Sequence, residues 1–445
     1  MCGHAFGCLQ KNQTMKKFLT SAGLIAISAS SIQAGSPVEL SPIEASKPWS
    51  VSAALRGFYD DNYTTSPKDF KRSSIGYELK PSASLNLPLD QTFIGLSYEY
   101  GFLYYEDRQD HKYDQNHKFD ARITHDFSPR YKLEVDDAFL VSQEPEVQSG
   151  VATSPLRSEG NNIRNLGTIK FTDQVTELLA VELGYANTFS DYQQDENTKD
   201  QFGETPKSLG YASKSGLLDR IEHAISIDLR WRAMSDTDGI LGYQFGIVDF
   251  TGDELLNPAE LDPSKQIVSD DRNSRSHRLY VGVDHRFNAQ LSGSVRVGGQ
   301  FTDYYNENQN NVSPYVDTSL TYLYGRGDYI QVGGNHSRAR TDVFSVDSSG
   351  DVTVDQEVTA IYLSVNHKIT PDLTGSLLVQ GQRATFYGGT EDGNVEYYFL
   401  PGLNLSYRFN PHVSAEAGYN FDRLDSDSGR SYSRNRVYVG VRATY

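Results

Sequence analysis

Charged side chains recur at alternate positions along segments whose intervening residues are apolar. Near the end of the chain, Arg436 and Arg442 have the opposite parity from Val437, Val439 and Val441. Charges of both signs on one face can form cross-strand ion pairs that stabilise a wall, and neighbouring bases can also attract anionic solutes. We expect the charged set on this face to line a lumen: Arg56, Arg122, Asp228, Arg230, Arg278, Asp284, Arg296, Glu396, Arg408, Glu416, Arg434, Arg436 and Arg442.

The sequence has no signature of catalysis or of a cofactor. The patterns G-x-S-x-G, H-E-x-x-H and G-x-x-x-x-G-K-[ST] are absent, as is a D-x-D-x-D-G metal loop. A catalytic triad is defined by spatial geometry, so sequence order does not exclude one. We predict no catalytic residue, no metal site and no cofactor.

The elements that carry the charged face have a period of two. Leu279, Val281 and Val283 alternate with Arg278 and Asp284, and similar alternation fills residues 225–232, 395–409 and 436–445. Side chains of a β-strand point alternately to its two faces, so this period predicts strands with one apolar and one polar face.

The connections between these strands are of two kinds. Eight are short turns, among them residues 127–130, 171–174 and 409–412, and they alternate with long polar stretches such as 191–216, 251–274 and 343–355. The count predicts about 18 strands (16–18), each about 10–14 residues long. Short turns at one end and long loops at the other are typical of a transmembrane antiparallel β-barrel, and we predict this all-β fold for residues 49–445.

Composition agrees with a two-faced fold. The chain has 445 residues, 38% of them hydrophobic and 12% aromatic, and a mean hydropathy of -0.53. Such polarity excludes a bundle of membrane-spanning helices, and the aromatic content disfavours disorder. The formal net charge of -17 disfavours a nucleic-acid partner.

The N-terminus has the features of a secretory signal. Lys16 and Lys17 precede an apolar segment, and Ala34 supplies a small residue for cleavage. We predict a spurious upstream extension at 1–14, a signal peptide at 15–34 and a periplasmic segment at 35–48. Both cysteines, Cys2 and Cys8, would be absent from the cleaved chain.

These features together resemble a Gram-negative outer-membrane β-barrel. The segment Leu55-Arg-Gly-Phe-Tyr-Asp-Asp-Asn62 and the array of hairpins are similar to the putative β-barrel porin 2 family, some of whose members resemble barrels linked to exopolysaccharide export. The resemblance implies location in the cell outer membrane. It also implies a C-terminal signal read by the barrel-assembly machinery, which maps onto Val437, Val439, Val441, Ala443 and Tyr445.

The leading functional prediction is a porin-like channel for passive diffusion of small hydrophilic solutes. The alternative is export of an extracellular polysaccharide, for which inward Tyr362, Tyr398 and Tyr438 could form part of a track. A receptor with a plugged lumen is disfavoured, because only residues 35–48 precede the first strand, and these are too few to form an N-terminal plug domain. The expected surroundings are outer-membrane lipid and surface glycolipid. Whether the protein forms a homo-oligomer is left open.

One loop contains apolar residues that need a surface to cover. We expect residues 209–218, with Leu209, Tyr211 and Leu218, either to constrict the pore or to pack on adjacent loops. The stretch 251–274 is the next candidate for a constriction.

Overall fold

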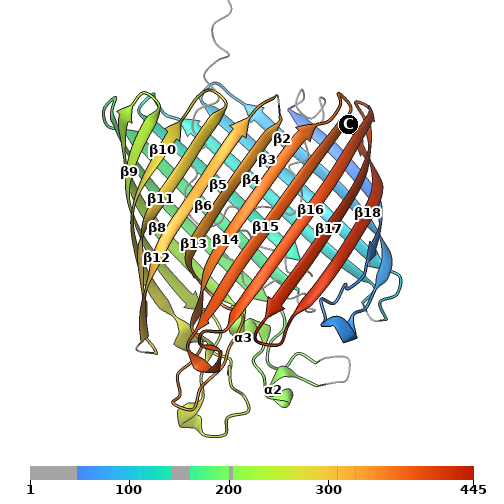
Figure 1. Cartoon of the computed structure of the whole chain (residues 1–445), viewed down its shortest axis with the longest axis vertical. Helices are drawn as coiled ribbons and strands as arrows, with labels where there is room; N and C mark the ends of the chain where they lie inside the picture. Colours follow the sequence, from blue (N-terminus) through green and yellow to red (C-terminus); the bar gives the residue numbers. More distant parts are fainter. Residues whose placement is uncertain (1–47, 110, 143–160, 200–203, 308, 326) are drawn as a thin grey trace, which may run out of the picture.

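The computed structural model is one closed antiparallel sheet of eighteen strands (Figure 1). It describes residues 48–109, 111–142, 161–199, 204–307, 309–325 and 327–445. Closure joins β1 (Trp49–Asp60) to β18 (Tyr432–Thr444) in nine residue pairs from Ser52↔Thr444 to Asp60↔Arg436. The predicted all-β barrel of about 18 strands is therefore confirmed. The extension at 1–14, the signal peptide at 15–34 and nearly all of 35–48 lie outside the described residues and stay predictions.

Each strand pairs with its neighbour in sequence, so the chain runs around the ring in order. The strands between the two ends are β2 (Ser74–Pro88), β3 (Thr92–Tyr105), β4 (Tyr113–Asp126), β5 (Tyr131–Ser142), β6 (Asn162–Gln174), β7 (Leu179–Tyr192), β8 (Arg220–Met234), β9 (Thr237–Phe250), β10 (Ser274–Arg286), β11 (Leu291–Tyr304), β12 (Gln309–Leu323), β13 (Tyr329–Ala339), β14 (Asp355–Lys368), β15 (Leu373–Tyr387), β16 (Val395–Asn410) and β17 (Val413–Ser426).

The short turns gather at one end of the barrel, together with the C-terminus, and the long loops gather at the other (Figure 1). One turn was predicted four residues too early. Residues 171–174 are the end of β6, still paired with β7, and the chain reverses at 175–178. The Thr176 hydroxyl accepts hydrogen bonds from the backbone N–H groups of Leu178 and Leu179, which closes the turn there.

The two faces of the strands differ in exposure. Val437, Val439 and Val441 are 44%, 66% and 51% exposed, whereas Arg434 and Arg442 are 7% and 9% exposed. In a closed sheet the concave face is the crowded one, so the covered charged set faces the interior and the apolar set faces outward.

Glycine makes room for inward aromatic rings at several strand pairs. A Cβ at Gly418 would lie 2.4 Å from the ring of Tyr438, and one at Gly333 would lie 2.6 Å from Tyr362. Both positions lie opposite the tyrosine on the adjacent strand, because Gly418 pairs with Tyr438 and Gly333 with Tyr362. These glycines therefore permit close approach of a ring to the backbone.

The sheet parts at its loop end between β12 and β13. These strands pair only from Val316↔His336 to Leu323↔Tyr329. Beyond that, residues 309–315 pair with β11 alone and residues 337–339 with β14 alone. Tyr304 of β11 donates a hydrogen bond to Asp355 of β14, so the ends of β13 and β14 lie against the interior side of β11.

Among the described residues, helical structure lies only in the connections between strands. The β7–β8 loop contains α2 (Pro206–Leu209) and α3 (Lys214–Leu218), and the 3-10 turns are η1 (Lys68–Phe70), η2 (Pro263–Lys265), η3 (Ser269–Arg272) and η4 (Gly389–Glu391). None of the helices in the described ranges is long and apolar enough to cross a membrane.

Candidate functional site

A group of ion pairs lies inside the barrel where its first and last strands meet. Glu416 of β17 accepts hydrogen bonds from Arg442 Nε at 2.5 Å and from Arg56 Nε at 2.8 Å. Arg56 also approaches Glu78 of β2, with Nη1 3.1 Å from Oε2. The four side chains come from four adjacent strands, so they cross-link the closure of the barrel; we call them the closure cluster.

A second group lies nearer the loop end of the same wall. Asp60 is fully buried, with Oδ2 3.7 Å from Arg434 Nη1 and 3.6 Å from Arg436 Nε. Arg434 also forms an ion pair with Asp422 of β17. The three bases predicted near the C-terminus therefore all have carboxylate partners.

The opposite wall carries its own network on β8, β10 and β11. Arg230 Nη2 lies 2.5 Å from Asp284 Oδ2, and Arg296 Nη2 lies 3.4 Å from Asp284 Oδ1. Tyr280 donates a hydrogen bond of 2.5 Å to Asp228. Which of these charges meet depends on the order of the strands in the sheet, and their role in lining a path for solutes stays a prediction.

The remaining predicted residues are dispersed. Arg122 forms an exposed pair with Asp136, with Nε 3.2 Å from Oδ1. Arg408 lies at the turn end of β16, where its Nη2 donates to the Pro371 carbonyl at 2.7 Å. Glu396 lies at the loop end and accepts a hydrogen bond of 2.6 Å from Arg430 Nε.

The predicted assembly signal lies on the outward face of the final strand and of the residue that follows it. Ala443 pairs with Ala53, and Val441 pairs with Leu55. The backbone of Tyr445 exchanges hydrogen bonds with Val51, at 3.1 Å and 2.9 Å, and its ring centroid lies 5.9 Å from that of Trp49. Recognition of this strand by assembly machinery stays a prediction.

The β13–β14 loop bridges the mouth of the barrel. Arg340 Nη2 lies 3.1 Å from Glu222 Oε2 on β8, and Asp342 Oδ2 lies 2.9 Å from Arg430 Nη1, between β17 and β18. β8 and β17 are nine positions apart in the eighteen-strand ring, so they are on opposite walls. Sequence analysis assigned no function to this loop.

Several loops pack together beside this bridge. Val352 and Val354, 0% and 3% exposed, pack with Tyr304, and Ile267 from the β9–β10 loop and Phe344 pack against them. Apolar burial of this kind holds a loop in place. The mouth is therefore narrowed by packed structure from several connections.

The segment 209–218, which was a candidate constriction, contacts the β9–β10 loop and the loop end of β7. Ser213 donates a hydrogen bond to Glu254 in the β9–β10 loop, and Ser215 donates one to the Tyr192 carbonyl of β7. Leu209 and Tyr211 are 52% and 48% exposed. These contacts favour the expectation that the segment packs on adjacent loops.

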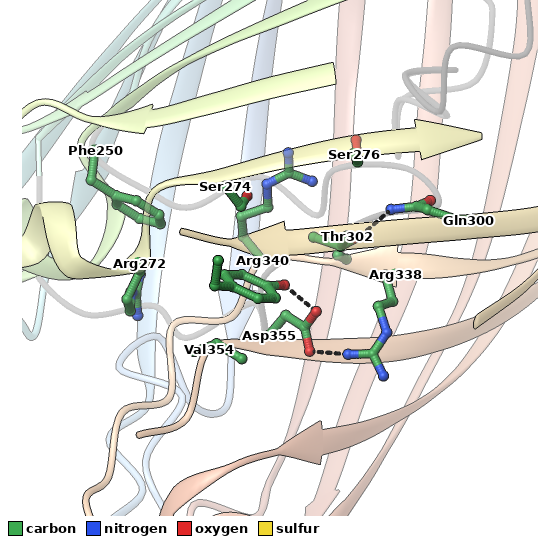
Figure 2. A pocket seen from close by; sticks show the side chains of 12 residues that line it. Phe250, Arg272, Ser274, Ser276, Gln300, Thr302, Arg338, Arg340, Val354 and Asp355 are labelled. Carbon is green, nitrogen blue, oxygen red and sulfur yellow. Dashed lines mark hydrogen bonds and ion pairs between the residues drawn. The ribbon is translucent and has the colours of Figure 1, made fainter. Parts of the chain in front are cut away.

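Three arginines that the sequence analysis did not single out converge at the mouth. Arg272 (η3), Arg338 (β13) and Arg340 line one pocket with the charged residue Asp355 (Figure 2). Arg278 of β10 lies close by and hydrogen-bonds only to Gln244 and Gln300 in the described structure. The sequence contains two groups of closely spaced arginines that could have indicated this site, one at 272, 275 and 278 and the other at 338 and 340.

Ionisable groups in the loops have displaced pKa values. Burial, followed by the nearby charge of Arg220, lowers the pKa of Arg272 to about 10. Burial raises the pKa of Asp219 to about 7, with Asp191 and Glu254 adding to the shift. Within the described residues no group of three or more His, Cys, Asp or Glu side chains is arranged to hold a metal ion.

The inward tyrosines do not gather into one track. Tyr438 lies beside Arg56, Tyr362 lies beside Gly333, and Tyr398 belongs to an apolar cluster with Leu424. This arrangement gives no support to the polysaccharide alternative.

A closed antiparallel barrel with an apolar outer face and a charged interior is the architecture of a transmembrane β-barrel of the outer membrane. The family model described as Putative beta-barrel porin 2 matches residues 357–445, which contain most of β14 and all of β15 to β18. The predicted resemblance to the putative β-barrel porin 2 family is therefore confirmed over these residues. No curated protein sequence matches the chain.

Solved outer-membrane proteins have similar folds at low identity. The outer membrane protein opdK from Pseudomonas aeruginosa is 10% identical, with 89% of this chain and 99% of that chain covered and a TM-score of 0.44. OccAB3 from Acinetobacter baumannii is 12% identical, with 89% and 99% covered and a TM-score of 0.40. The FrpB iron transporter from Neisseria meningitidis is 8% identical, with 90% and 81% covered and a TM-score of 0.41.

Proposed function

We propose that the protein is a porin-like channel through which small hydrophilic solutes diffuse passively. The observation that carries the proposal is the charged interior face of a closed eighteen-strand barrel. A barrel of this strand number is too wide for side chains alone to fill, so water enters beside the charged walls. The predicted lumen-lining residues then present both signs of charge to a solute.

The packed mouth limits the size of solute that this proposal allows. The bridge formed by Arg340 and Asp342 joins opposite walls, and the loops beside it bury apolar side chains. Small solutes can pass beside such a bridge, whereas a polymer needs a wider continuous path. We therefore assign small solutes rather than polysaccharide to the channel.

Single-channel recording in planar bilayers tests the proposal. Purified barrels should insert and give a steady conductance that rises in proportion to salt concentration, as expected for passive diffusion. Liposomes containing the barrel should also swell in small neutral sugars and not in large ones. Correctly folded barrels that insert but carry no current and pass no sugar would contradict the proposal.

The proposal includes recognition of the C-terminal strand during assembly. Deleting Tyr445 removes its backbone hydrogen bonds to Val51 and its ring contact with Trp49. The deletion should reduce the amount of barrel in the outer-membrane fraction, while Tyr445→Phe, which keeps the ring, should not. Equal amounts of deleted and intact protein would reject the assigned role.

A further inference from the structure

The mouth contains a buried arginine without a counter-charge of its own. Arg272 is 1% exposed, and its Nη2 donates to the Leu217 carbonyl at 2.6 Å. Its Nε and Nη1 have no hydrogen-bond partner, and it forms no ion pair with any described residue. Its Cζ lies 4.4 Å from the ring centroid of Phe250, which supports one face of the guanidinium.

Neighbouring groups add positive charge and further donors. Arg340 also lines the pocket, and its Nε is buried without a partner although its Nη2 pairs with Glu222. Ser274 and Thr302 contribute hydroxyl groups to the lining. Figure 2 shows Phe250 and Arg272 on one side of the pocket, with Arg338 and Asp355 on the other.

The one carboxylate in the pocket lining is already engaged. Asp355 is 2% exposed and accepts hydrogen bonds from Arg338 and from Tyr304. It therefore does not neutralise Arg272. This differs from the closure cluster, where each arginine has a carboxylate within 3.1 Å.

A guanidinium removed from water needs a compensating anion or a full set of hydrogen bonds. The planar N–H groups of arginine match the two oxygens of a carboxylate or of a phosphate. Burial also lowers the pKa of Arg272 to about 10, which leaves the group protonated at neutral pH.

We propose that Arg272 and Arg340 form a binding site for a small oxyanion, a carboxylate or inorganic phosphate, at the loop end of the barrel. The free space at the pocket is about 330 Å³ only when the open solvent at its mouth is included, and the enclosed part is small, so the site suits one small anionic group rather than a large molecule. An anion held here lies at the bridged mouth, so the site also favours entry of anions over cations. That second role rests on the proposed channel, whereas binding does not.

Binding is measured on the intact barrel in detergent by isothermal titration calorimetry. Acetate and inorganic phosphate are the probes, and chloride at the same ionic strength is the reference. We expect at least one probe to bind the wild type. Arg272→Gln should weaken that binding by about tenfold or more, because it removes charge-assisted hydrogen bonds.

Two further variants control for folding and for charge. Arg340→Gln changes a less buried lining residue and should also weaken binding. It takes the place of Arg272→Gln in the test if that variant fails to fold. Arg423→Gln makes the same change of charge outside the pocket, at a side chain that is 55% exposed, and should leave binding unchanged. Absence of binding by the wild type, or equal binding by the wild type and the folded pocket variants, overturns the proposal.

Bilayer recording separates the two roles. Arg272→Gln, or Arg340→Gln in its place, should lower the ratio of anion to cation permeability, whereas Arg423→Gln should not. Probe binding without any conductance would retain the site and reject the channel. Conductance with unchanged selectivity in the pocket variants would reject the selectivity role.

Discussion

The closure cluster and the Arg272 pocket are both buried and rich in arginine, but they differ in how charge is balanced. In the closure cluster Glu416 lies between Arg56 and Arg442, and Glu78 provides a second carboxylate. In the pocket Arg272 has a carbonyl and an aromatic ring as neighbours and no carboxylate partner among the described residues. Paired charges hold adjacent strands together, whereas an unpaired charge remains available to a ligand.

The largest expected effect comes from breaking the balanced cluster. Glu416→Ala leaves Arg442 without its carboxylate and leaves Arg56 with Glu78 alone. Removing one partner of a buried pair costs about 3–5 kcal/mol because the remaining charge is uncompensated. Urea unfolding of the barrel in lipid vesicles, followed by circular dichroism, measures the loss.

An exposed pair at the loop end provides the matched control. Arg423 and Asp425 are 55% and 53% exposed, and Nη2 lies 2.8 Å from Oδ2. Asp425→Asn should cost less than about 1 kcal/mol, because water screens such a pair. Equal losses for the two variants would show that the closure cluster contributes no more than a surface contact.

The next-largest effect tests the assignment of the apolar face of the strands to the outside of the barrel and of the charged face to the inside. Val439 is 66% exposed on the outward face of β18. Val439→Arg should destabilise the barrel by about 2–4 kcal/mol if this face meets lipid near the membrane centre, and Val439→Leu should be nearly neutral. The same vesicle unfolding measures both variants.

Thiol labelling checks the same assignment without a stability measurement. Asn404 accepts a hydrogen bond of 2.7 Å from inward Tyr438, whereas Leu405 is 36% exposed on the other face. A water-soluble thiol reagent should modify cysteine at 404 and not at 405. Modification at 405 alone would invert the assignment, because side chains alternate strictly along a strand.

The strands could be predicted from sequence because one local rule repeats in each of them. Val437, Val439 and Val441 alternate with inward bases, and a period of two specifies both the strand and its faces. Seven of the eight turns lie where expected, and the eighth is displaced because the Thr176 hydroxyl organises the reversal after 174.

The mouth could not be predicted in this way. Arg272 belongs to a loop that reads as solvated and acidic around Asp270 and Asp271, yet it is buried by Phe250 and by the β7–β8 loop. Arg338 and Asp355 face the interior side of β11 because β12 and β13 part. Such contacts join residues far apart in the chain, and no period within one segment encodes them.

The bridged mouth gives a prediction for single-channel conductance. Replacing residues 341–353 with a short Gly-Ser linker removes the contact between Asp342 and Arg430 and the apolar packing of Val352. Single-channel conductance should rise. Replacing residues 205–211, where Leu209 and Tyr211 are largely exposed, should leave it unchanged. If conductance rose only when residues 205–211 were replaced, the constriction would lie in the β7–β8 loop instead.

The smallest effect concerns an unpaired acid, the counterpart of Arg272. Asp219 accepts a hydrogen bond of 2.6 Å from the Tyr192 backbone N–H, and burial raises its pKa to about 7, with Asp191 and Glu254 adding to the rise. An unfolded Asp titrates near a pKa of about 3.9, so between these values the folded loop binds more protons than the unfolded loop. Its stabilising contribution is therefore complete below about pH 4 and is lost as pH rises through about 7.

Limited proteolysis of the β7–β8 loop should become faster between pH 5 and pH 8, after correction for the protease's own pH dependence. Asp219→Asn, which cannot ionise, should abolish that dependence, whereas the exposed Asp425→Asn should retain it. A pH dependence that persists in Asp219→Asn would assign the titration to another group, with Glu254, whose pKa is also raised mainly by burial, as the next to replace.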